Sequence, residues 1–281
     1  MDTALHIWVK SGADKRKVIA REELHRIFQA GSLIHADGLA VENTSVEDID
    51  IHSFQVFFQR FIGEPLDKQD QSTQDVLKNM NLMQGTNINT SGLLLFGKTP
   101  QFKLPIFMVK AVAFPGQCIT DTQYIDSKDI TGRLDEQFRN TMSFLLANLK
   151  HVQNGQSINS IGEPEIPRIV LEEMLANAFI HRDYFTSAPI RVLIFADRVE
   201  LISPGHLPNT LSVEKIKYGN SNVRNPIIAS FAPHLLPYRG LGSGILRSLK
   251  LYPNIDFIDD REGNNFKAII QRQGKSGQLH Y

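Results

Sequence analysis

The segment from Glu173 to Tyr184 constrains the fold more than any other part of the sequence. Its polar residues Glu173, Asn177 and His181 recur at every fourth position, and a helix turns once in about 3.6 residues, so the three side chains share one helix face. The residues between them are mostly apolar, which is typical of a buried helix. A carboxylate, an amide and an imidazole on such a helix need polar partners, either from the surrounding protein or from a ligand in a pocket.

The composition is that of an ordinary globular chain. The 281 residues are enough for two ordinary domains or one large one. Basic and acidic residues number 30 each, so no overall charge favours binding to nucleic acid or to a membrane. The one cysteine, Cys118, excludes an internal disulfide, and no apolar run reaches the length of a membrane span. We therefore expect a cytoplasmic protein with no membrane partner.

The order of the expected elements predicts an α+β fold in four regions. Residues 1–30 are expected to hold a strand, a basic turn at 15–17 and a helix, and 31–100 a linker followed by a small, mostly helical subdomain. The main α/β domain is expected at 101–272, and 273–281 is expected to be a disordered tail. Within 31–272 we expect helices at 46–61, 72–80, 134–149, 167–181, 225–231 and 244–250, and strands at 105–114, 123–130, 190–195, 198–202, 255–258 and 266–270.

One motif imitates a phosphate-binding loop. The string Gly92-Leu-Leu-Leu-Phe-Gly-Lys-Thr99 satisfies the P-loop pattern G-x-x-x-x-G-K-[ST]. A genuine P-loop lies between a strand and a helix, and its backbone amides surround the phosphates. Here the four middle residues favour burial, and Pro100 follows directly. We interpret the segment as a buried strand or helix end followed by a turn, and expect no P-loop helicase motor.

Two later segments could complete a site with the helix of Glu173. One is a strand that stops abruptly at Ser203-Pro-Gly205. The other carries Gly240, Gly242 and Gly244 directly before a helix, where exposed backbone amides favour an anion such as phosphate. A flexible lid without a ligand is the alternative interpretation of these glycines.

Together these motifs resemble the N, G1 and G2 boxes of the GHKL ATPases. The resemblance is closer to the RecG-related branch, whose members are labelled ATP-dependent DNA helicases or transcriptional regulators, and it covers roughly residues 40–271. It implies a two-layer α/β sandwich of the GHKL (Bergerat) type with a small helical N-terminal subdomain. The matching segments are Glu173-x-x-x-Asn177-Ala178, Asn177–Tyr184, Ile202–Gly205, Val223–Pro226, Gly240–Gly244 and Leu94–Lys98.

The resemblance implies a role for each candidate residue. Glu173 matches the glutamate that activates water for attack on the γ-phosphate of ATP, and Asn177 matches the amide that binds Mg²⁺. The three glycines of the 240–244 loop, Gly240, Gly242 and Gly244, match the lid that wraps the phosphates. ATP and Mg²⁺ are therefore the implied cofactors.

The adenine end of the site departs from the family pattern. Ser203, in the same turn as Gly205, stands where most members place an aspartate that holds the adenine amino group. Losing such a charge-assisted bond costs about 1.5–3 kcal/mol, although a serine with a bridging water can partly replace it. The departure weakens the expectation of nucleotide binding.

Two functions follow from the resemblance. The first is a nucleotide-binding module, with or without ATP hydrolysis, in a DNA-associated protein or transcriptional regulator. The alternative is a degenerate, non-catalytic scaffold for oligomerisation or signalling beside a nucleic-acid-binding domain. Residues 1–30 resemble the end of a Schlafen/AlbA-type domain, so we expect a piece of a longer, homo-oligomeric protein that meets DNA through other domains.

Neighbouring polar residues have structural explanations. His181 either bonds to backbone in the core or faces the ligand, and the sequence leaves both open. Arg182 and Asp183 are expected to join an ion-pair network. Asn225 is expected to cap a helix that begins at Pro226.

Overall fold

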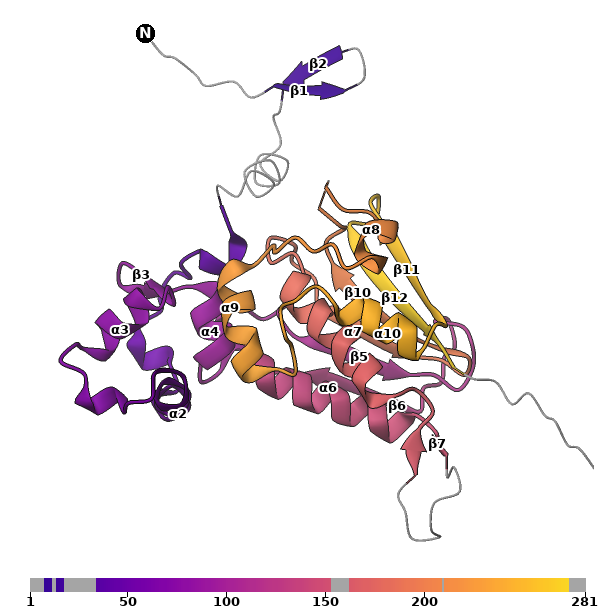
Figure 1. The fold of residues 1–281 in the computed structure, drawn as a ribbon, viewed down its shortest axis with the longest axis horizontal. Helices are drawn as coiled ribbons and strands as arrows, with labels where there is room; N and C mark the ends of the chain where they lie inside the picture. The colour runs from indigo at the N-terminus through magenta and orange to yellow at the C-terminus, as the bar shows by residue number, and fades with distance from the viewer. Residues whose placement is uncertain (1–7, 12–13, 18–33, 153–161, 209, 273–281) are drawn as a thin grey trace, which may run out of the picture.

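The computed structural model describes residues 8–11, 14–17, 34–152, 162–208 and 210–272, and shows a mixed six-stranded sheet with helices against it (Figure 1). The strand order is β11-β12-β10-β9-β5-β6, and all neighbours are antiparallel except β5 and β9. The predicted α+β class is confirmed. The strands are β5 (Val109–Ala113), β6 (Asp126–Ile130), β9 (Ile190–Ile194), β10 (Arg198–Pro204), β11 (Ile255–Asp260) and β12 (Asn265–Gln271).

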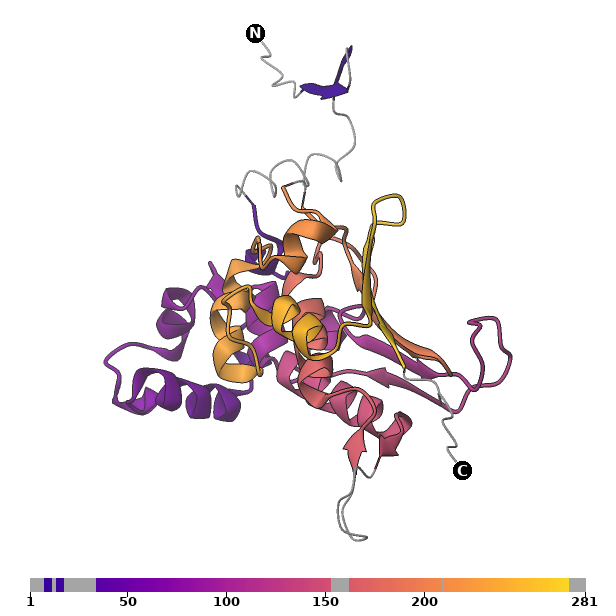
Figure 2. The ribbon, with the colours of Figure 1, turned by 45° about the vertical axis from the view of Figure 1, so that its right-hand side comes forward.

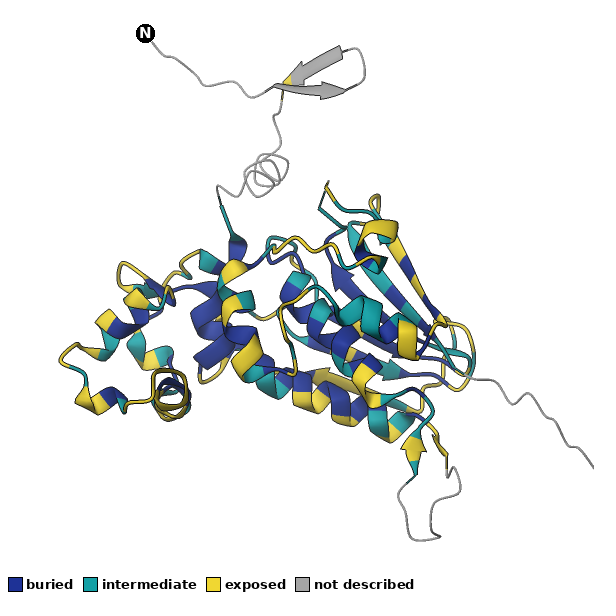
Figure 3. Cartoon of the chain, in the orientation of Figure 1, coloured by how far each residue is buried: buried dark blue, intermediate teal, exposed yellow. Residues whose placement is uncertain are grey.

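One face of the sheet carries the principal helices α6 (Leu134–Asn148), α7 (Arg168–His181) and α10 (Gly244–Leu251), as two views show (Figures 1 and 2). Side chains alternate between the faces of a strand, so one set faces the helices. Val192 of β9, which points inward, is fully buried, whereas its neighbour Arg191 is exposed. Figure 3 shows the same contrast between buried and exposed positions across the molecule.

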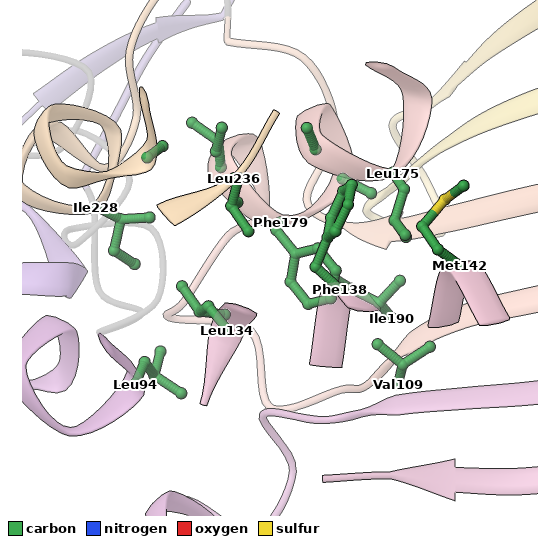
Figure 4. Packing of buried hydrophobic residues seen from close by; sticks show 14 of the residues in the cluster. Leu94, Val109, Leu134, Phe138, Met142, Leu175, Phe179, Ile190, Ile228 and Leu236 are labelled. Carbon is green, nitrogen blue, oxygen red and sulfur yellow. The ribbon is translucent and has the colours of Figure 1, made fainter. Parts of the chain in front are cut away.

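The core lies between this sheet and helices α6 and α7 (Figure 4). Phe179 of α7 packs against Phe138 of α6, with ring centroids 6.4 Å apart. Leu175 of α7 and Ile190 of β9 are fully buried in the same cluster. The apolar residues of α7 therefore hold it over the sheet, which fixes where its polar residues point.

The N-terminal subdomain is mostly helical, as expected. An aromatic cluster joins it to α9 (Pro226–Leu235), because Phe96 contacts Phe57 and Phe231 with ring centroids 5.0 and 5.9 Å apart. The subdomain and the α/β layers thus share one hydrophobic core. Its elements are η1 (Ala36–Gly38), η2 (Val46–Asp48), α2 (Ile51–Ile62), η3 (Leu66–Lys68), α3 (Thr73–Asn79), β3 (Met83–Gln84), β4 (Asn87–Ile88), α4 (Thr90–Phe96) and α5 (Pro100–Lys103).

The P-loop imitation is helix α4. Every residue of this helix is buried, and a Cβ added at Gly92 would overlap the carbonyl oxygen of Leu82. Residues 92–97 of the imitation pack inside the protein, with no room for a phosphate beside Gly92, and Lys98 and Thr99 follow as exposed residues. The interpretation as a buried helix end is confirmed.

The helix predicted at 46–61 is divided in two. Ser45 caps the short helix η2, and Asp50 begins α2 by accepting a hydrogen bond from the Ser53 amide at 3.1 Å. Between them Ile49 is extended and fully buried. Two successive N-caps therefore override the continuous apolar periodicity.

The expected linker lies at the start of region 31–100, and its described part, residues 34–46, packs against α9 through η1. Asp37 is fully buried, and its Oδ2 accepts hydrogen bonds from the amides of Ile227 and Ile228 at 2.8 and 3.0 Å. The Asp37 carboxylate, which is distant in sequence, therefore caps the N-terminus of α9 in place of the Asn225 side chain. Asn225 is the N-cap residue and Pro226 the first residue of α9, as predicted, but the Asn225 side chain makes no capping bond and donates to the carbonyl oxygens that end α7.

The remaining elements are short. Residues 15–17, expected to be a turn, lie in β2 and pair with β1. The helix expected at 21–28 and the tail 273–281 lie outside the described residues. Within the described part of the chain, no helix has the length and hydropathy needed to cross a bilayer. The short elements are β1 (Trp8–Ser11), β2 (Asp14–Lys17), β7 (His151–Val152), β8 (Glu163–Pro164) and α8 (Val213–Lys217).

Candidate functional site

A single cavity brings together all the candidate residues. The cavity is open to solvent, and roughly 1050 Å³ of empty space lies within it and at its mouth. Its walls come from α7, α10, the sheet strands β10 to β12 and the loops that follow β10 and α9. The candidates on its lining are Glu173, Asn177, Ser203, Gly205, Gly240, Gly242 and Gly244.

The polar stripe of α7 faces this cavity. Glu173, Asn177 and His181 all line it, whereas Leu175 and Phe179 are buried in the core. The stripe, together with Met174 and Ala178, thus borders the cavity, while most apolar residues of the helix pack in the core. Both alternatives that the periodicity allowed hold in part, because the stripe faces a cavity while Glu173 and Asn177 also have polar partners within the protein.

Glu173 is buried and ion-paired. Its side chain is 6% exposed, and its Oε1 accepts a hydrogen bond from Arg247 of α10. A Cβ added at Gly244 would overlap the same carboxylate, so glycine at this position lets α10 lie close to Glu173 without displacing its side chain. The sequence pattern did not identify Arg247, although its position three residues after Gly244 places both on one side of α10.

Asn177 is anchored and partly accessible. Its Nδ2 donates to the carbonyl oxygen of Glu173 at 2.8 Å, which leaves the amide oxygen available as a ligand. The described residues contain no cluster of three or more His, Cys, Asp or Glu that could hold a metal ion. Mg²⁺ is commonly held by one or two protein oxygens together with substrate phosphates and water, so a lone Asn177 oxygen fits Mg²⁺ only alongside a phosphate ligand.

The end of β10 forms the opposite wall. Ser203 is buried, and its hydroxyl donates to the carbonyl oxygen of Ala178 at 3.0 Å. Gly205 has φ of +95°, and a Cβ added there would lie 2.5 Å from the Cβ of Asp183. Glycine is therefore required both by the backbone conformation and by the closeness of the chain after α7.

The glycine loop joins the cavity to α10. Gly240 and Gly242 have left-handed φ values of +69° and +67°, and between them Leu241 is 76% exposed. Ser243 is the N-cap residue of α10 but makes no side-chain capping bond. The first turn of α10 therefore presents backbone amides that its N-cap side chain does not satisfy, a favourable setting for an anion.

The charge around the cavity favours an anion as well. Among the described residues, its lining includes the arginines Arg224, Arg239 and Arg247 but only one carboxylate, that of Glu173. Arg224 donates to the carbonyl oxygens of His181 and His206, so it also holds the loops of the cavity together.

A buried arginine stabilises the segment that follows α7. Arg182 is 2% exposed and donates to the carbonyl oxygen of Ala188 at 2.6 Å. Its guanidinium lies 4.6 and 4.8 Å from the ring centroids of Phe107 and Tyr184. Asp183 accepts from the amide of Phe185 instead of an arginine. Backbone carbonyls, aromatic rings and a local turn thus provide these contacts, where an ion-pair network was expected.

We expect His181 to make the stability of the protein depend on pH. Burial, followed by the charge of Arg224, lowers its pKa from 6.5 to about 4. Below about pH 6.5 the unfolded chain binds a proton that the folded protein does not, so the free energy of unfolding should fall between about pH 6.5 and 4. We expect a loss of about 1–2 kcal/mol, allowing for partial access through the cavity.

Urea unfolding at pH 7.5 and 5 measures this loss. His181→Gln should reduce the difference between the two pH values, whereas His52→Gln, at an exposed position on α2, should preserve it. Equal pH dependence in the wild type and His181→Gln would contradict the assignment.

Comparison with known proteins supports part of the resemblance. Residues 187–262 match the family described as "Putative ATP-dependent DNA helicase recG C-terminal". This stretch is similar to the ATPase-like region of RecG-related proteins. It includes Ser203, Gly205 and the glycine loop, whereas Glu173 and Asn177 precede it. A search of curated proteins found no match.

A solved structure shares the fold. It is the crystal structure of the DIP2311 protein from Corynebacterium diphtheriae, with a TM-score of 0.61 and 19% sequence identity. The similarity covers 95% of this chain and 52% of that chain, so the present chain spans about half the length of this relative. At this identity the similarity concerns the fold alone.

Proposed function

We propose that this chain is a GHKL-type nucleotide-binding module that holds ATP and Mg²⁺ in the cavity between α7 and α10. One observation carries the proposal: the cavity is lined by a buried carboxylate, an amide one helical turn later and a glycine loop at the start of a helix. An excess of arginines around it supports a phosphorylated ligand. The RecG-related match supports the same class of ligand.

Each part of the site has a distinct task in this proposal. The 240–244 loop and the start of α10 would bind the phosphates, and Asn177 would contribute an oxygen to Mg²⁺, which offsets phosphate charge. Ser203, buried at the end of β10, would face the base with its hydroxyl oxygen as acceptor. Apolar lining residues such as Met174 and Phe257 would contact the faces of the base.

Hydrolysis would require Glu173 as the general base. Water oxygen would bond to the γ-phosphorus as the bond from that phosphorus to the leaving ADP oxygen breaks. Glu173 would take the proton of the attacking water. Loss of this carboxylate should reduce the hydrolysis rate about 100-fold or more while leaving a ligand-sized cavity.

Thermal unfolding with MgATP tests the binding step. At ATP concentrations about 100 times the dissociation constant, binding adds about 2.7 kcal/mol, which should raise the melting temperature by several degrees. Asn177→Ala should lose most of this rise. No rise in the wild type at millimolar MgATP would contradict the proposal.

Asn148→Ala provides a matched control. The Asn148 side chain also donates to a carbonyl four residues earlier, that of Phe144, at 3.0 Å, but it does not line the cavity. It should therefore retain the full MgATP-induced rise. An equal loss in both variants would indicate a general effect of the substitution.

A second function is favoured by two contacts. The Glu173 carboxylate is held by Arg247, and the Ser203 hydroxyl is bonded to Ala178 where a carboxylate is usual. Both features suit a non-catalytic scaffold for oligomerisation or signalling beside a nucleic-acid-binding domain. An assay of phosphate release separates the two functions. If the wild type and Glu173→Gln both bind MgATP and release phosphate at the same slow rate, the protein is a non-catalytic scaffold.

The association with DNA or transcription rests on the resemblance to the RecG-related branch and would act through domains other than this one. Oligomerisation is part of the same proposal. Sedimentation of the protein with and without MgATP measures it directly.

A further inference from the structure

The ion pair between Glu173 and Arg247 connects two walls of the cavity. Glu173 belongs to α7 and Arg247 to α10, and both line the cavity. A carboxylate as buried as Glu173 is costly without a partner, and Arg247 supplies that partner. The pKa of Tyr238, another residue of the cavity lining, is raised by burial and then by the negative charge of Glu173.

Arg247 retains hydrogen-bonding capacity beyond this pair. A guanidinium has five N–H donors, and the contact to Glu173 is made through Nη2. Within the described residues, the Nε of Arg247 is buried without an acceptor. The side chain is 31% exposed, so the guanidinium is neither fully buried nor fully hydrated. It is thus equipped to bind a second anionic group.

The position of Arg247 relates it to the glycine loop. It lies three residues after Gly244, so both residues lie on the side of α10 that meets Glu173. An anion at the start of α10 would meet the amides of its first turn and the guanidinium of Arg247 together. Arginine suits this arrangement, because its planar donors match phosphate oxygens in pairs.

We propose that Arg247 recognises the terminal phosphate of the bound nucleotide by exchanging Glu173 for a phosphate oxygen. This inference rests on the proposed function of the cavity and concerns its specificity. With no phosphate bound, Glu173 is held in the ion pair. When a triphosphate binds, its terminal phosphate forms hydrogen bonds with the guanidinium of Arg247. The Glu173 carboxylate is then free to accept a proton from water. Arg247 therefore makes the cavity selective for a phosphorylated nucleotide over a nucleoside.

Calorimetric titration of Arg247→Gln tests this role. The probes are the non-hydrolysable imido analogue of ATP with Mg²⁺, and adenosine. We expect the variant to bind the analogue about 10- to 100-fold more weakly than the wild type, because charge-assisted bonds to phosphate are lost. Adenosine affinity should change less than about threefold, since adenosine carries no phosphate.

Arg239→Gln is the matched control. Arg239 also lines the cavity, and its replacement removes the same charge, but it is exposed and precedes the 240–244 loop instead of lying on α10. Its analogue affinity should fall less than about threefold, which separates a specific contact from the general positive field of the cavity. An equal loss in Arg239→Gln and Arg247→Gln would overturn the assignment to Arg247.

Arg247→Gln leaves the Glu173 carboxylate buried without a partner, which by itself can destabilise the fold. A second comparison therefore uses variants that lack this carboxylate. Glu173→Gln and the double variant Glu173→Gln/Arg247→Gln both lack that charge. The double variant should bind the analogue at least about tenfold more weakly than Glu173→Gln.

The possible failures are distinguishable. A wild type that binds neither the analogue nor adenosine would overturn the proposed function and this inference together. If the wild type binds the analogue but Arg247→Gln binds it equally well, and Glu173→Gln and the double variant also bind it equally well, the role of Arg247 alone is overturned. A parallel loss of adenosine binding would assign Arg247 to the shape of the cavity.

Discussion

Replacing Arg182 by methionine should lower the free energy of unfolding by about 2–4 kcal/mol, among the largest effects of any single substitution outside the apolar core. The side chain is 2% exposed and donates to the carbonyl oxygens of Thr186 and Ala188. Methionine fills much of the space but leaves both carbonyls without this donor, at about 1–3 kcal/mol for each that stays buried. It also loses the cation–π contacts with Phe107 and Tyr184.

Urea unfolding followed by circular dichroism measures this change, and Arg198→Met is the control. Arg198 also stacks on an aromatic ring, 4.1 Å from the centroid of Phe195, but it is 23% exposed and pairs with Asp197 and Glu200 at the surface. Its loss should cost about 1 kcal/mol or less. Equal costs at the two arginines would show that the buried carbonyls next to Arg182 contribute little.

Replacing Gly205 by alanine should destabilise the protein by about 2–4 kcal/mol and distort the wall of the cavity. The φ of +95° is unfavourable for alanine, and the added Cβ would lie 2.5 Å from the Cβ of Asp183. Neither atom is at the end of a flexible side chain, so the backbone after β10 or after α7 has to move. Because Gly205 lines the cavity, MgATP-induced stabilisation should also fall.

Gly63→Ala separates the two contributions to this cost. Gly63 has nearly the same φ, +91°, but nothing lies within 4 Å of an added Cβ. Only the backbone strain remains there, about 1 kcal/mol. Thermal and urea unfolding of both variants should show a clearly larger loss at Gly205. A similar loss at both glycines would mean that the contact with Asp183 relaxes without cost.

Local patterns predicted most of the elements in the α/β part. The helix expected at 167–181 is α7 (Arg168–His181), and the two strand pairs expected at 190–202 and 255–270 are the hairpins β9–β10 and β11–β12. Such elements depend on periodicities and turns within a dozen residues, which a single sequence contains. The helix at 46–61 was predicted as one piece because apolar periodicity continues across the second cap at Asp50.

Local patterns also predicted part of the candidate site. The spacing of Glu173 and Asn177 placed them on one face, and the glycines marked a loop before a helix. Arg247 was missed because an arginine on a short amphipathic helix has the pattern of a solvated side chain, and only its contact with Glu173 distinguishes it. Asn225 is the N-cap residue as predicted, but its side chain bonds elsewhere, because the carboxylate of Asp37, 190 positions before Ile227, reaches the same helix start.

The sequence by itself determined the α+β class, the polar stripe along α7 and the presence of a glycine loop before a helix, since each follows from backbone periodicity or from residue types within a short segment. Only the tertiary structure decided what the stripe faces. The ion pair of Glu173 with Arg247, the cap from Asp37 and the carbonyl partners of Arg182 depend on how the apolar faces pack. A buried charge takes the partner that packing brings within reach, and no local pattern specifies that partner.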